Sequence, residues 1–230
     1  MALFPRWTNN VARASALFAL LLPAVALAAL WVLQRTPWVT RQAEPVEQPV
    51  QFDHRHHVRD EGIDCRFCHT EVERSPSAGI PSTQVCMGCH AQVWNKGAYL
   101  EPVRAAWFSD RGIPWRRVHD LPDFVYFNHA IHAGKGVGCV TCHGRVDEMP
   151  VTQQASPLTM GWCLGCHRDP TPNLRPVEQV TSLTWTATEE LRRRGEPATG
   201  DAEKDARALG AQLATQHDVH TRDSCSTCHR

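Results

Sequence analysis

The ten cysteines of this 230-residue chain follow one rule. They form five C-x-x-C pairs, and a histidine directly follows each pair. This spacing lets one turn of chain present two thiols to the vinyl groups of a porphyrin, while the histidine ligates its iron. The pattern predicts five covalent c-type haems, with thioether bonds from the cysteines and proximal ligands from the histidines. In chain order these are site 1 (Cys65, Cys68, His69), site 2 (Cys86, Cys89, His90), site 3 (Cys139, Cys142, His143), site 4 (Cys163, Cys166, His167) and site 5 (Cys225, Cys228, His229).

Two other uses of paired cysteines explain the pattern less well. Zinc ribbons also contain C-x-x-C pairs, and a disulfide framework is common in exported proteins. Neither requires a histidine after every second cysteine. The haem interpretation accounts for all ten cysteines and for the five adjoining histidines together.

Eight further histidines are available as distal iron ligands. The pattern F-x-H-x-x-H occurs at 52–57, shortly before site 1, and again at 127–132, shortly before site 3. Histidines three residues apart share one face of a helix, so each pair could reach two neighbouring haems. The predicted distal ligands are His54, His57, His129 and His132.

The fifth distal ligand stays open between His119, Met149, Met160, His217 and His220. A methionine ligand would raise the potential of its haem, although methionine also packs well against apolar surfaces. His217 and His220 fit a solvated surface equally well. Five six-coordinate irons would leave no position for a substrate, which predicts an electron carrier with no catalytic residues of its own. A multihaem enzyme would instead need one five-coordinate iron.

The elements that must position these sites begin with an apolar run. Residues 14–33 carry no charge, and 20 residues of helix span the hydrocarbon core of about 30 Å. Arginines flank the run at positions 6, 13, 35 and 41. A cleaved signal peptide is the alternative, with Ala24-Val25-Ala26 or Ala26-Leu27-Ala28 as the cleavage site, but the run exceeds the usual signal core of about 7–15 residues. We expect a cytoplasmic segment at 1–13, a single-pass anchor at 14–34 and a linker at 35–51.

The remainder, 52–230, is predicted to be a periplasmic five-haem domain, since haem is attached outside the cytoplasm. Two-haem modules at about 52–90 and 127–167 indicate a duplication. Outside the anchor roughly a third of the residues are apolar, below the usual ~45–50%. We therefore expect short α-helices and irregular chain wrapped on haems, almost no β-sheet, and an apo-chain that does not fold. Helices at 186–194 and 201–216 are interpreted as exposed or as partner surface. Acidic and basic residues number 24 each, which argues against nucleic-acid binding.

Arginine greatly outnumbers lysine in this sequence. Haem propionates are carboxylates, which a guanidinium group can bind in bidentate fashion. The candidates for such contacts are Arg66, Arg116, Arg117, Arg145 and Arg168.

Residues 48–170 resemble the pentahaem cytochrome c component of bacterial alternative complex III. The segments that carry the resemblance are FDHRHHVRDEGIDCRFCHTEVERSPSAGIP, TQVCMGCH, RVHDLPDFVYFNHAIHAGKGVGC, CHGRVDEMP and LTMGWCLGCHRDP. The resemblance implies an inner-membrane complex that oxidises quinol, with polytopic quinol-binding subunits. This pentahaem component would carry electrons from an iron–sulfur subunit toward a monohaem cytochrome c or a terminal oxidase. The stretch 177–224 has no match in that family.

Two further points follow from resemblance. The F-x-H-x-x-H lead-ins resemble those of small multihaem cytochromes c, which implies His54 as the distal ligand at site 1 and His129 at site 3. His57 and His132 would then serve other haems. The rival hypothesis for the whole chain is a stand-alone, membrane-anchored quinol dehydrogenase that feeds periplasmic reductases.

Overall fold

The computed structural model describes residues 4, 5 and 7–229. Arg6, expected to flank the anchor, lies outside the described residues, as do 1–3 and 230 at the ends of the predicted segments. The chain divides into two units, one ending at Gln42 and one beginning at Ala43.

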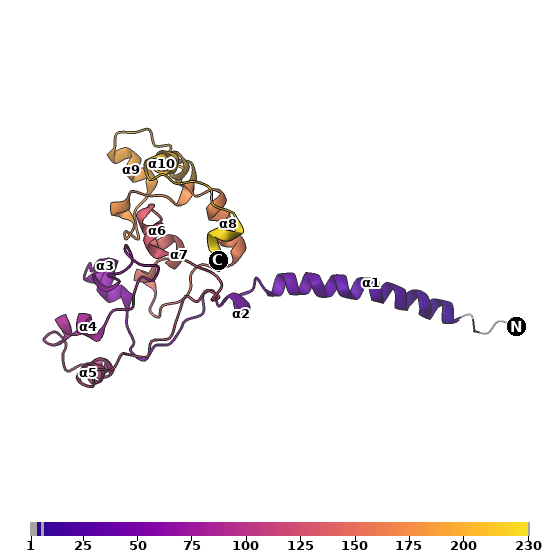
Figure 1. Cartoon of the computed structure of the whole chain (residues 1–230), viewed down its shortest axis with the longest axis horizontal. Coiled ribbons are helices and arrows are strands. Elements are labelled where there is room, and N and C mark those ends of the chain that lie inside the picture. The colour runs from indigo at the N-terminus through magenta and orange to yellow at the C-terminus, as the bar shows by residue number, and fades with distance from the viewer. Residues whose placement is uncertain (1–3, 6, 230) are drawn as a thin grey trace. The chain divides into compact units, whose positions relative to one another are not determined.

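The first unit consists of a long apolar helix, α1 (Trp7–Leu33), followed by the short α2 (Pro37–Thr40) (Figure 1). Helix α1 is long and apolar enough to cross a membrane, and none of its described side chains is buried within the protein. The helix begins seven residues before the predicted span. Residues 7–13 are more polar, but they extend the helix because its backbone hydrogen bonds do not depend on apolar side chains. A single N-terminal anchoring helix is consistent with these features.

The second unit is helical, as predicted, and residues 43–229 contain no named strand. Two isolated bridges, Pro45 with Gln153 and Val137 with Leu174, are the recorded β-type pairings in this part of the chain. Its helices are η1 (Arg55–Asp60), α3 (Cys65–Cys68), α4 (Thr83–His90), η2 (Ala98–Leu100), α5 (Glu101–Phe108), α6 (His129–Gly134), α7 (Cys139–His143), η3 (Val146–Glu148), α8 (Met160–Arg168), η4 (Thr171–Asn173), η5 (Val177–Gln179), α9 (Ala187–Arg193), α10 (Ala202–Gln216) and α11 (Cys225–Cys228).

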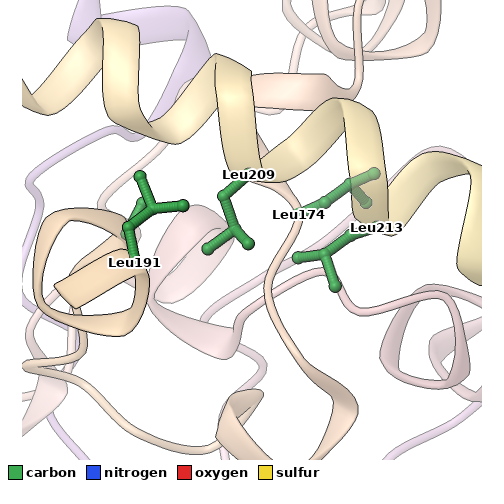
Figure 2. Close-up of a cluster of buried hydrophobic side chains, with 5 residues drawn as sticks. Leu174, Leu191, Leu209 and Leu213 are labelled. Atoms are coloured by element: carbon green, nitrogen blue, oxygen red, sulfur yellow. The ribbon is translucent and has the colours of Figure 1, made fainter. Parts of the chain in front are cut away.

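A protein-only core lies between α9, α10 and the residue after η4. Leu191 of α9, Leu209 and Leu213 of α10, and Leu174 point into one cluster and are at most 2% exposed (Figure 2). The interpretation of α9 and α10 as merely exposed helices was therefore wrong, although both helices form where the sequence predicted them. Leu209 and Leu213 lie four residues apart, so they share the buried face of α10.

Polar side chains fix the ends of these two helices. Asp201 caps α10 by accepting from the backbone of Glu203 and Lys204. In α9, Glu190 accepts hydrogen bonds from Arg193 at 2.6 Å and Arg194 at 2.7 Å. These guanidinium groups lower the pKa of Glu190 to about 2.

A second, smaller cluster consists of Val50, Leu100 and Val103, with Trp115 packed against it. This cluster packs the segment around Val50, which precedes the first haem motif, against η2 and α5. Beyond these two clusters, several large apolar side chains around the C-x-x-C-H motifs are exposed.

Candidate haem-binding sites

Each C-x-x-C-H motif folds as a single helical turn. Sites 1, 3 and 5 form the short helices α3, α7 and α11, while sites 2 and 4 are within α4 and α8. At site 1 the His69 backbone N–H donates to Cys65 O at 2.9 Å, and the carboxylate of Asp64 caps the turn. Since residues i and i+3 lie on the same helix face, each turn presents its two thiols together. All ten thiols are free within the described residues.

Four proximal histidines have the tautomer that an iron ligand needs. A carbonyl oxygen can only accept, so the nitrogen bonded to it carries the proton and Nε2 keeps its lone pair for a metal. The Nδ1 groups of these histidines donate to backbone carbonyls: His69 to Gly79 at 2.7 Å, His90 to Val93 at 3.0 Å, His167 to Arg222 at 2.8 Å and His229 to Phe124 at 3.0 Å.

Three predicted distal histidines are held in the same way. Nδ1 of His57 donates to Asp53 O at 3.0 Å, and Nδ1 of His132 donates to Asn128 O at 2.7 Å. His129 Nδ1 donates to the more distant Pro76 O at 2.8 Å. His54 differs, because its Nδ1 lies 3.2 Å from the Thr152 hydroxyl.

The two F-x-H-x-x-H lead-ins have matching geometry. Phe52 meets the first histidine edge-on at 4.8 Å and 83° and stacks on the second at 4.4 Å and 25°. Phe127 repeats this arrangement at 4.7 Å and 89°, then 4.5 Å and 25°. The backbones differ, since η1 is a π-helix and α6 is an α-helix. The same ring arrangement in both lead-ins supports the proposed duplication.

The spacing between histidine rings tests whether haem iron fits. Metal–imidazole bonds are about 2 Å long, so two rings on opposite sides of one iron have centroids about 6 Å apart. Three pairs of one predicted distal and one proximal histidine meet this requirement. They are His57 with His90 at 6.1 Å, His132 with His167 at 6.0 Å, and His129 with His143 at 6.4 Å.

Electrostatics agree with a fourth pairing, of His54 with His69. The pKa of His54 is lowered to about 4, first by burial and then by the nearby charge of His69. At site 3, burial lowers the pKa of His143 to about 3, with His119 and His129 as the next causes. Both histidines are therefore neutral near pH 7, which is the form that binds a metal.

His119 occupies a distinct position beside site 3. Its ring centroid lies 4.3 Å from that of His143 at 73°, too close for an iron between the two. Its Nε2 is buried without a hydrogen-bond partner, and burial followed by the charge of His129 lowers its pKa. Met149 lies near the same site, since its methyl group approaches Gly144. These contacts place His119 and Met149 beside site 3 and pair neither of them with site 5.

The other candidates have structural or solvent-exposed roles. Nε2 of His220 bonds the carboxylate of Asp218 at 2.8 Å, which occupies the nitrogen that a metal would need. His217 ends α10 and lies 3.3 Å from the Lys135 carbonyl. His56 is exposed beside Asp60, and Met160 is 69% exposed.

Bare apolar side chains surround several of the attachment sites. Phe67 lies inside the site 1 motif, Trp94 follows site 2, Ile131 lies between two predicted distal ligands, and Phe124 packs beside His229. All four are more than half exposed. A porphyrin over each motif would cover such surfaces, which are unusual in a soluble protein. The residues present therefore fit covalent haem.

Sequence reasoning missed Arg175, which is 7% exposed and lies under the turn that leads into site 3. Its Nη1 donates to Ser182 O at 2.8 Å, its guanidinium group lies 4.9 Å from the centre of the Trp185 ring, and its Nε is buried without a partner. No motif marks this residue. Four of the arginines considered as propionate partners are paired with carboxylates of the chain: Arg66 with Asp64, Arg117 with Asp120, Arg145 with Asp147, and Arg168 with Asp223.

Comparison with known proteins agrees with this chemistry. No family model matches the chain. Over 102 residues the chain is 35% identical to the menaquinone reductase multiheme cytochrome c subunit of Nitratidesulfovibrio vulgaris, a match that covers 42% of this chain and 46% of the relative. The matched region thus spans about half the length of that curated relative. The similarity supports a multihaem cytochrome c with covalent haem, of the kind found in quinone-oxidoreductase complexes and active in electron transport.

Proposed function

We propose that this protein is the five-haem electron-transfer subunit of a quinol-oxidising membrane complex of the alternative complex III type. The observation that carries the proposal is the set of three distal–proximal histidine pairs spaced 6.0–6.4 Å apart. Such pairs would close both axial positions of an iron, leaving it to carry electrons without binding substrate. The chain on its own would then not be an enzyme.

Bound haem would supply one-electron chemistry at iron. The protein's part is to fix where and how the iron is held. Carbonyl groups set the tautomers of His69, His90, His167 and His229, so that each Nε2 is available without reorganisation. The packed rings of Phe52 and Phe127 hold the distal pairs in position.

The proposed arrangement follows the anchor. The segment 14–34 would span the inner membrane once, with 1–13 in the cytoplasm, 35–51 as a linker and 52–230 in the periplasm. The proposed partners are an iron–sulfur subunit, polytopic quinol-binding subunits and a monohaem cytochrome c subunit, with a terminal oxidase as the alternative acceptor.

Mild detergent extraction followed by affinity purification and mass spectrometry tests the assignment. We expect the iron–sulfur and polytopic subunits to co-purify in constant ratio, and electron paramagnetic resonance to show low-spin haem. The matched control is the same preparation of the chain with 1–42 replaced by a cleavable export signal. An isolated chain that oxidises quinol by itself would refute this proposal in favour of the stand-alone quinol dehydrogenase.

The opposite direction of electron flow is the second candidate. It is favoured by the name of the matched relative, which belongs to a menaquinone reductase. Reduction of the haems by added quinol in the purified complex would support quinol oxidation. Reoxidation of pre-reduced haems by added quinone, without reduction by quinol, would support quinone reduction instead.

A further inference from the structure

We propose that the five attachment sites lie in a single line in the order 2, 1, 3, 4, 5, so that partner proteins exchange electrons with sites 2 and 5. This inference rests on the proposed function and gives it a direction along the protein. The order is not that of the sequence, because the first two sites are exchanged. Each of the four links in the line is supported by separate contacts. Figure 1 shows α4, α3, α7 and α8 following one another across the second unit, with the C-terminal turn beside α8.

Sites 2 and 1 are linked by a shared histidine segment. His57 belongs to the lead-in of site 1, yet its ring faces His90 of site 2 at 6.1 Å. The two motifs also approach each other directly. The partly buried Cys68 thiol lies close enough to Cys86 and Cys89 to interact with them electrostatically.

Sites 1 and 3 are joined by two consecutive residues of the chain. The Cys65 thiol donates to Thr181 O at 3.9 Å, and the Cys139 backbone N–H donates to Val180 O at 2.8 Å. The Cys65 and Cys139 thiols also lie close enough to interact electrostatically. The first site of one proposed module therefore contacts the first site of the other module. The two modules join at sites 1 and 3, although sites 2 and 3 are the neighbours in the sequence.

Sites 3 and 4 repeat the link between sites 1 and 2. His132 belongs to the lead-in of site 3, and its ring faces His167 of site 4 at 6.0 Å. The partly buried Cys142 thiol lies close enough to Cys166 and Cys163 of site 4 to interact with them electrostatically.

Sites 4 and 5 are linked through the segment that precedes the last motif. His167 Nδ1 donates to Arg222 O at 2.8 Å, and the Arg222 backbone N–H donates to His167 O at 3.2 Å. Arg168 and Asp223 lie 3.8 Å apart in the same contact. Among the causes that raise the pKa of the Cys163 thiol, Cys228 of site 5 follows burial.

Solvent exposure distinguishes the two ends of the line. Cys89 of site 2 and Cys225 of site 5 are exposed, whereas the other eight cysteines are partly buried. At site 3, in the middle of the line, Cys139, Cys142 and His143 are all partly buried. A partner redox protein could therefore approach the edges of sites 2 and 5 more closely than it could approach site 3.

The test compares His57→Met with His54→Met in the purified holoprotein. Each exchange replaces one predicted distal ligand and raises the potential of that haem, and nuclear magnetic resonance redox titration follows every haem separately. We expect His57→Met to shift the midpoint of one other haem, at site 1. His54→Met is expected to shift two others, at sites 2 and 3, because site 1 lies between them. A shift at site 3 caused by His57→Met would overturn the order.

Cryo-electron microscopy of the wild-type holoprotein gives the same answer without any substitution. The iron of site 1 should lie between those of sites 2 and 3; an iron of site 2 lying nearest to that of site 3 would refute the proposal. Both measurements use the chain without partners. If the expected subunits fail to co-purify while the irons lie in the proposed order, the proposed function fails and this inference stands.

Discussion

Gly210, in the middle of α10, gives the sharpest test of how the C-terminal part of this protein packs. A glycine inside a helix ordinarily destabilises it, and replacement by alanine would stabilise an isolated helix by about 1 kcal/mol. Here α10 packs against η4, and a Cβ atom at Gly210 would lie 2.7 Å from the carbonyl carbon of Thr171 and closer still to its oxygen. We predict that Gly210→Ala destabilises the protein.

The magnitude follows from the contact. Carbon and oxygen atoms ordinarily approach to about 3.3 Å, so α10 would have to move from η4 by on the order of 1 Å. The obstacle is backbone, which cannot rotate away as a side chain would. Leu209 and Leu213 are both fully buried next to this position, so the shift would loosen their packing. Overpacking of this kind costs about 1–3 kcal/mol. At about 2–4 °C per kcal/mol for a domain of this size, Tm should fall by roughly 2–12 °C.

The assay is thermal unfolding of the holoprotein followed by far-ultraviolet circular dichroism. Ala211→Gly, at the next and exposed position of α10, is the matched control. It should lower Tm only by the helix-propensity effect of about 1 kcal/mol. If Gly210→Ala has the Tm of the wild type or a higher one, the close approach of α10 to η4 is refuted.

Three further predictions concern the ligands, acid stability and the anchor. His132→Met should convert one bis-histidine haem to histidine–methionine coordination, seen by magnetic circular dichroism as a new methionine-to-iron band. The control His56→Met should leave the spectrum unchanged. An unaltered spectrum for His132→Met would remove that ligand from site 4. Glu190 contributes stability that is fully present above its ordinary pKa of 4.5 and is lost as pH falls toward about 2. Glu190→Gln should therefore flatten the pH dependence of Tm across this window. An equally steep fall of Tm with acid in the variant would contradict the role of the Glu190 ion pairs. Replacement of 1–42 by a cleavable export signal should move the protein from the membrane to the soluble fraction without altering its haem spectrum, and retention in washed membranes would show that other contacts anchor it.

Much of the local structure followed from the sequence because its causes are local. The C-x-x-C-H motifs form single turns, Asp201 caps α10, and α9 forms at its predicted place. In α9, Arg193 and Arg194 both bond the Glu190 carboxylate, while the Glu189 carboxylate accepts from the hydroxyl of the capping residue Thr186.

The burial of α9 and α10 could not be deduced with the same certainty. Leu209 and Leu213 repeat at helical spacing, but only small and polar residues lie between them, and charged residues precede them in the helix. Their burial depends on Leu174 and on η4, which are more than thirty residues away in the chain. Arg175 illustrates the same limit, because nothing in its sequence neighbours marks it as buried beside site 3.

By itself, the sequence determined the chemistry: five thiol pairs, each with an adjoining histidine, and an apolar helix long enough to span a membrane. These features depend on covalent spacing and on residues within one or two helical turns. Only the tertiary structure decided which histidine faces which, since His57 and His90 are brought together across an intervening motif. It also placed site 1 against site 3 through Val180 and Thr181. Contacts between distant segments depend on how the whole chain packs, so spacing along the sequence could not specify the order of the sites.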